Sequence, residues 1–435
     1  FTLPDAQCSW KAPFTFTSTE RFRPATGYSS PVFYQIQRVF VGDDIAASTL
    51  KMRLFNSALA SVFLAVAMWV ASPAVRRSLA LTWMIMAVPL IAFTIASTTP
   101  QSWAVAGASF SWVFLNSWLL SDSTKRAHRY VALSALIVTL VVASSARSDA
   151  ALFALISYLA VITLRWKDRR EFGKRLITLS IPVLVIAALG LLYRASTTIP
   201  RVLSGSNSES SVFPSQLFVS MLADLPAFFI GFTGFFPASE VPWNGHVSWG
   251  LGWEGFPSPS FSYLALILAL GGVTLWGLHS LSRARLLALI VLTLPLVAIP
   301  VVAVLWVTRF NTGVQLRYFL PLVLVVVSFS LLNDSTFSNR LSGLQLGVVS
   351  FLAAAGSAVA FVSATVRYRD GLTGLWDVQW ARVWFDPPSA AVSDPITIGF
   401  GLLALTIFSG VTVLLFWKNQ PANASVQVTL PSKGA

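Results

Sequence analysis

The sequence predicts an all-α polytopic membrane protein with about 11 transmembrane helices in this chain. Hydrophobic residues make up 55% of the chain and charged residues only 11%, whereas about 25% are charged in an ordinary soluble domain. Eleven apolar stretches approach or reach the ~20 residues that a helix needs to cross the hydrocarbon of a bilayer. Basic residues gather in alternate connections between these stretches, which is typical of cytoplasmic loops.

The predicted spans fall into two blocks and a last helix. Six lie in a block over 54–193, four in a block over 259–364, and one within 396–435, which also holds the tail. The spans are 54–72, 79–97, 103–121, 129–146, 149–165, 175–193, 259–280, 285–306, 317–332, 343–364 and 396–417. Each is apolar enough to satisfy its backbone polar groups as a helix in lipid.

The connection 165–175 predicts the orientation of all the spans. It reads RWKDRREFGKR and holds six basic residues, so we expect it to be cytoplasmic. Alternation from there places every short basic loop and the C-terminus on the cytoplasmic side. The N-terminus is then outside, which predicts one further span upstream and twelve in total. This asymmetry accounts for the net charge of +13, so we expect no nucleic-acid partner.

Long connections lie on the opposite, extracytoplasmic side. They are the first loop region 1–53, the loop 194–258 and the Trp-rich segment 365–395. Within the second, the apolar segment 212–236 contains Asp224 and Pro226. We interpret it as an interfacial or re-entrant helix, with a true span as the alternative. Loops of this length usually carry function, which predicts that the protein works on the outer side.

Tryptophans are frequent in two of these loops. Trp376, Trp380 and Trp384 are spaced to form one stripe on a helix. The stripe is typical of an interfacial helix at headgroup depth, and a platform for a sugar ring or lipid head is the alternative.

The second loop contains PWNGHVSWGLGWEGFPSPS. Trp249 and Trp253 either anchor this loop or pack against the apolar face of a sugar. His246 is interpreted as a hydrogen-bonding loop residue, and a role as a base or ligand is the alternative.

Charged residues near the outer ends of spans are candidates for a binding site, because charges at this depth are costly and usually paired or functional. Arg147 and Asp149 lie in the short connection SSARSDAALF. They form a local pair with Asp149 as the N-cap of the next helix, or they face a phosphate and a hydroxyl. Arg317 and Tyr318 open the span RYFLPLVLVVVSF, and Arg53 opens the first span. Both arginines either snorkel to the headgroups or bind a lipid phosphate.

Other chemistries leave no signature. The chain has one cysteine, Cys8, and it lacks a His-Glu-x-x-His motif, a Gly-x-Ser-x-Gly elbow and a Gly-rich phosphate loop. We therefore predict no cofactor. A divalent metal is left open, although no cluster of metal ligands is evident.

An ordered set of motifs resembles the DUF2142 family of bacterial multispanning proteins, related to GT-C-type membrane glycosyltransferases. The matching pieces are SSPVFYQIQRVF, LKMRLFNSAL, SARSDAALFAL, GLGWEGFPSPSFSYLAL and GVQLRYFLPL. Two departures stand out. The family usually has an acidic motif early in the first outer loop, and this chain begins beyond it. Glu254 follows the signature Trp253 where a Leu-Asp pair is expected, so it is a substitute carboxylate or a local break in the analogy.

The resemblance implies a GT-C-like fold in the bacterial cytoplasmic membrane with its active side outside. It implies sugar transfer from a polyprenyl-phosphate donor to a cell-envelope glycan acceptor, with membrane lipids as surroundings. A transporter of a lipid-linked glycan and a non-catalytic envelope-assembly subunit are the alternatives. The implied roles are phosphate binding by Arg317, Arg147 and Arg53, acid–base catalysis by Asp5, Glu254 and Asp149, and sugar or lipid contacts by Tyr318, Trp249, Trp253 and His246.

Overall fold

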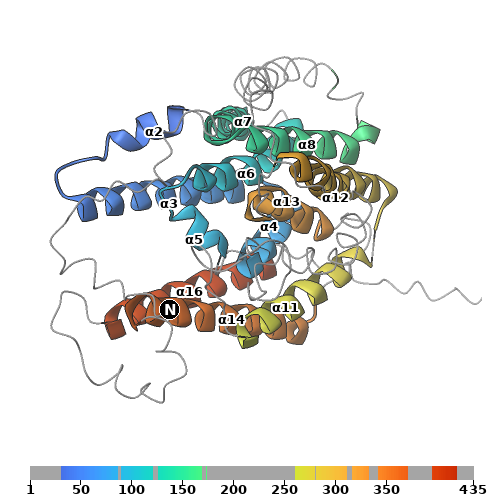
Figure 1. The fold of residues 1–435 in the computed structure, drawn as a ribbon. Helices are drawn as coiled ribbons and strands as arrows, with labels where there is room; N and C mark the ends of the chain where they lie inside the picture. Colours follow the sequence, from blue (N-terminus) through green and yellow to red (C-terminus); the bar gives the residue numbers. More distant parts are fainter. Residues whose placement is uncertain are drawn as a thin grey trace, which may run out of the picture.

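The structure is a computed structural model. It describes residues 31–86, 90–120, 126–168, 173, 260–279, 281–310, 316–332, 341–370 and 394–418. Every regular element in these residues is a helix (Figure 1). The helices are α2 (Pro31–Arg38), α3 (Ile45–Val70), α4 (Pro73–Met86), α5 (Ala92–Ile95), α6 (Pro100–Leu120), α7 (Arg126–Ala146), α8 (Ser148–Leu164), η3 (Trp166–Asp168), α11 (Ser260–Leu278), α12 (Arg283–Phe310), η4 (Leu316–Phe319), α13 (Leu320–Ser330), α14 (Gly343–Asp370) and α16 (Asp394–Lys418).

The predicted all-α membrane class is confirmed. By length and composition, five described helices can cross a membrane, and three shorter apolar helices accompany them. All predicted spans but one coincide with described helices. The exception, 175–193, the whole loop 194–258 with its segment 212–236, and residues 371–393 of the Trp-rich segment lie outside the described residues.

One predicted span is described in two parts. The sequence predicts a helix over 79–97, and the structure describes α4 as far as Met86, a π-helical turn at residues 90–91 and the short α5. Residues 87–89 between these elements lie outside the described residues.

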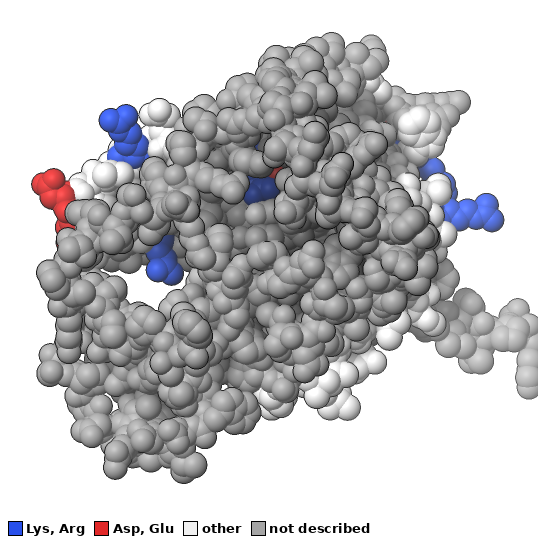
Figure 2. Space-filling model, in the orientation of Figure 1, with Lys and Arg blue, Asp and Glu red and all other residues white. Residues whose placement is uncertain are grey.

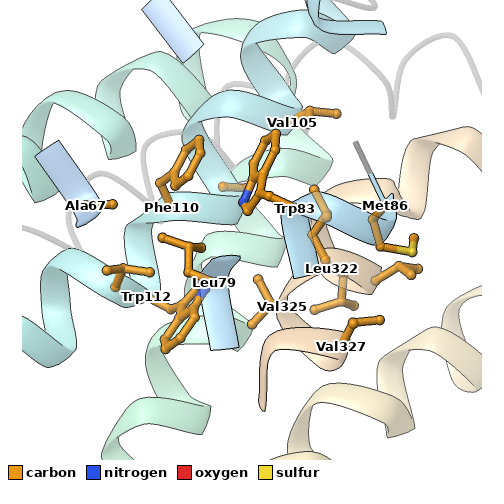
Figure 3. Close-up of a cluster of buried hydrophobic side chains, with 14 of the residues drawn as sticks. Ala67, Leu79, Trp83, Met86, Val105, Phe110, Trp112, Leu322, Val325 and Val327 are labelled. Atoms are coloured by element: carbon orange, nitrogen blue, oxygen red, sulfur yellow. The ribbon is translucent and has the colours of Figure 1, made fainter. Parts of the chain in front are cut away.

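Three helices, α4, α6 and α13, form the centre of the bundle (Figure 1). In the 18-residue apolar stretch of α6, 94% of the residues are buried inside the protein. Trp83 of α4 stacks on Phe110 of α6 with their ring centroids 4.8 Å apart, and Trp112 of α6 packs on Phe329 of α13. Figure 3 shows Trp83 and Phe110 beside side chains of α13, including Leu322 and Val325. The peripheral helices differ. Only 11% of the residues in the apolar stretch of α16 and 22% of those in the apolar stretch of α3 are buried, as expected for lipid-facing helices.

Close contacts and hydroxyl groups join neighbouring helices, as is usual where lipid supplies no hydrophobic drive for helix association. A Cβ on Gly107 of α6 would lie 2.6 Å from the backbone nitrogen of Ala143 in α7. Ser78 of α4 donates to the carbonyl oxygen of Ser328 in α13, whose hydroxyl donates to Thr82 at 3.2 Å.

Helices such as α3, α14 and α16 run broadly across Figure 1, and contacts identify two ends of the bundle. At the loop end, where α3, α6 and α8 begin, Arg53 contacts Ala96. At the basic end, where α4 and α7 begin, His128 packs on Trp69 and Arg129 lies over Trp118. In Figure 2 most visible charged side chains of described residues lie at the left and right margins, and one blue and red patch is recessed near the middle.

Candidate functional site at the loop end

The connection between α7 and α8 holds a bidentate ion pair. The Arg147 backbone is extended, with φ −155° and ψ 144°, and its side chain reaches Asp149 in the first turn of α8. Its Nε–H donates to both carboxylate oxygens of Asp149, at 2.9 and 3.1 Å, and its Nη2 donates to Oδ2 at 2.8 Å. The planar guanidinium fork matches a carboxylate in this way, which makes the pair directional as well as charged. The predicted local pair is present.

The predicted cap is wrong by two residues. The helix begins at Ser148, so Arg147 occupies the N-cap position and makes no side-chain capping bond. Asp149 lies in the first turn, where a carboxylate interacts favourably with the helix dipole, and its Oδ1 accepts from the backbone N–H of Ala150 at 3.0 Å.

Tyr318 joins this pair from a distant part of the sequence. The guanidinium carbon of Arg147 lies 3.8 Å from the centroid of the Tyr318 ring, which is cation–π geometry. A second contact between the same segments places the rings of Phe153 and Phe319 5.6 Å apart. The motifs SARSDAALFAL and GVQLRYFLPL therefore meet at the start of α8 and η4.

The pair is only partly accessible. The exposed fractions of the Arg147 and Asp149 side chains are 24% and 22%. Burial lowers the pKa of the Arg147 guanidinium, but the nearby Asp149 carboxylate and Tyr318 raise the pKa further, and the net shift is upward. Arg147 is thus held as a cation at the mouth of the bundle. Its Nη1 atom takes part in none of the three bonds to Asp149.

A second polar cluster lies at the loop end around Asn56 of α3. The Asn56 Oδ1 atom accepts from Gln37 Nε2 of α2 at 2.7 Å and from Trp103 Nε1 of α6 at 2.9 Å. Its Nδ2 donates to the carbonyl oxygen of Ser97 at 2.8 Å. Asn56 is 2% exposed, so one buried amide joins α2, α3, α6 and the turn before α6.

Sequence reasoning missed this cluster, although a signal was present. Asn56 is a lone amide within the apolar run LFNSALA, and Gln37 lies in FYQIQRVF. A polar side chain in such a run needs a buried partner.

Arg53 lies one turn from Asn56 on α3. Its side chain is exposed, and its Nε–H donates to the carbonyl oxygen of Ala96 at 3.0 Å. This bond orients Arg53 at the loop end, as the snorkelling and phosphate-binding interpretations both require.

Arg317 belongs to η4, directly before Tyr318. The other predicted site residues lie outside the described residues: Asp5, Glu254, Trp249, Trp253 and His246. Within the described part of the chain, no three His, Cys, Asp or Glu side chains group as metal ligands.

A family model described as "Predicted membrane protein (DUF2142)" matches residues 8–326. The match covers both halves of the Arg147–Tyr318 contact and the Asn56 cluster, and it ends within α13. No curated protein matches the chain. No solved structure matches it either.

Proposed function

We infer that this chain, which belongs to the DUF2142 family of predicted membrane proteins, transfers a sugar from a polyprenyl-phosphate donor to a cell-envelope glycan at the outer face of the membrane. The observation that carries the proposal is the contact of Arg147, Asp149 and Tyr318 at the loop end. A lipid-linked donor is consistent with this site, because its tail dissolves between helices while its phosphate stays near the headgroups.

Arg147 is the proposed phosphate ligand. It is a permanent cation, it is oriented by two partners, and its Nη1 atom is not engaged by Asp149. In the reaction, the acceptor hydroxyl oxygen bonds to the anomeric carbon while the bond from that carbon to the phosphate oxygen breaks. The polyprenyl phosphate leaves with added negative charge, and a fixed cation stabilises this charge without reorganisation. Arg53 and Arg317 are further proposed phosphate ligands.

Asp149 fits a positioning role better than that of a general base. Both of its oxygens accept bonds from Arg147, and Oδ1 also accepts from Ala150. A carboxylate engaged in this way has little capacity to take a proton from an acceptor. The proton is therefore assigned to a carboxylate of the outer loops, for which Asp5 and Glu254 remain the candidates.

The test is transfer by the purified protein in liposomes, with a radiolabelled polyprenyl-phosphate sugar and an envelope glycan acceptor. Arg147→Gln should lower the rate by about 100-fold, as expected for loss of a charge that acts on the transition state. Lys51→Gln is the matched control, because it removes an exposed cation from α3 at the same loop end of the bundle.

Transfer at the wild-type rate by a folded Arg147→Gln protein would overturn the proposal. Movement of the lipid-linked sugar across the liposome membrane without a covalent product would instead establish a transporter.

A further inference from the structure

The basic end of the bundle holds a second cluster of cations and rings, far along the helices from the candidate site. Trp69 lies in the last turn of α3, and its ring centroid lies 4.6 Å from that of His128 in α7. Arg76 of α4 donates from Nη2 to the Trp69 carbonyl oxygen at 2.9 Å. Arg129 follows His128, with its guanidinium carbon 6.0 Å from the Trp118 ring centroid. We call Trp69, Arg76, His128 and Arg129 the basic-end cluster.

The cluster has positive charge without a described carboxylate to neutralise it. Among the residues that the structure describes, the ion pair is that of Arg147 and Asp149, at the other end of the bundle. The Nε atom of Arg76 is buried and has no hydrogen-bond partner. A buried donor of this kind is costly unless an acceptor reaches it, and a phosphate oxygen is a suitable acceptor.

The position of Trp69 indicates a lipid rather than a soluble anion. Its side chain is 49% exposed at the end of α3, whose apolar window is only 22% buried and so faces the hydrocarbon. Indole rings favour this boundary, where one edge is apolar and the N–H meets polar headgroups. Arg76, bonded to the Trp69 carbonyl, and Arg129, the residue after His128 in α7, supply two cations at this boundary, which suits a phosphodiester with attached acyl chains.

We propose that the basic-end cluster binds the phosphodiester headgroup of an acidic phospholipid. Arg76 and Arg129 contact the phosphate, Trp69 packs on the glycerol and upper acyl chains, and His128 holds the Trp69 ring. The site is separate from sugar transfer and would stand if that proposed function failed. It ties α3, α4 and α7 together at the leaflet where the basic loops lie.

The test uses the full chain in nanodiscs of zwitterionic phospholipid, with phosphatidylglycerol added as the probe and bound lipid counted by native mass spectrometry. Arg76→Gln and Arg129→Gln should each weaken phosphatidylglycerol binding about fivefold, the effect expected for one cation near a membrane surface. Arg76→Lys keeps the charge and should bind nearly as the wild type does.

Lys167→Gln is the matched control, since it removes an exposed cation from the same end without touching the cluster. Equal weakening by Lys167→Gln would reduce the effect to general surface charge and overturn the proposal. Unchanged binding by Arg76→Gln/Arg129→Gln would do the same. Glycerol phosphate should compete poorly, and competition as strong as that of the lipid would make this a site for a free anion instead.

Unchanged melting temperatures of the variants in purely zwitterionic nanodiscs exclude a folding defect. If Arg76→Gln has a lower melting temperature, its binding result is set aside. The proposal is then decided by phosphatidylglycerol binding of Arg76→Lys and Arg129→Gln relative to the wild type.

Discussion

Arg147 and Tyr318 face each other across two segments that are remote in sequence, with the guanidinium carbon 3.8 Å from the ring centroid. The contact fixes the start of α8 against η4, at the entrance to the buried helix α13. Since Asp149 binds the same guanidinium through Nε and Nη2, Arg147 has one face on a ring and one edge on a carboxylate. Its position is therefore determined by partners from both segments.

Tyr318→Leu should destabilise the protein, because it removes the ring under Arg147. A partly desolvated cation–π contact contributes about 0.5–2 kcal/mol, so we expect a melting temperature lower by a few degrees in detergent. Tyr318→Phe keeps the ring but loses the hydroxyl that also interacts with Arg147, so it should melt between Tyr318→Leu and the wild type. Tyr130→Leu, at an exposed tyrosine of α7, is the control. Equal melting of Tyr318→Leu and wild type would show that the contact contributes no stability.

Asn56→Ala should weaken the attachment of α2 to the bundle. The change leaves the buried donors of Gln37 and Trp103 without their acceptor, at a cost of about 1–3 kcal/mol each where no water enters. Limited proteolysis near α2 should become faster, and the melting temperature should fall. Ser61→Ala, which removes an exposed hydroxyl on the same helix, should change neither. A protease-resistant α2 in Asn56→Ala would contradict the proposed attachment.

Gly107→Ala should separate α6 from α7. The added Cβ would lie 2.6 Å from Ala143 N and 2.7 Å from Thr139 O, and these backbone atoms cannot rotate away. Overpacking of this kind costs about 1–3 kcal/mol or more, and the fluorescence-detected yield of folded monomer should drop with the melting temperature. Gly271→Ala is the control, because no atom lies within 4 Å of its added Cβ. Normal folding of Gly107→Ala would mean that the two helices pack less closely than described.

The two ends of the bundle should be in different compartments. Cys8 is the chain's one cysteine, so Cys8→Ser gives a background for single labels. In that background Asp43→Cys, an exposed position before α3, should react with an impermeant maleimide added outside whole cells. Lys167→Cys, exposed beyond α8, should react only after the membrane is opened. Labelling of both positions from one side would refute the alternating topology and the outer location of the candidate site.

The sequence predicted the helices well, because hydropathy and length decide where a chain can cross lipid. Arg147 and Asp149 are two residues apart, so their pairing was also predictable. The contact with Tyr318 was not, since it depends on how α8 and α13 pack. The Asn56 cluster was missed for the same reason: its three partners come from segments whose proximity no local pattern encodes.

Helix α16 lies beyond the residues that the family model matches, and only 11% of its apolar window is enclosed by other parts of the protein. Most of its surface is thus solvated by acyl chains, which accept almost any apolar side chain of similar size. Substitutions among Leu, Ile, Val and Phe along this helix should consequently be neutral, and its end is a suitable attachment point for a fluorescent reporter or an affinity handle.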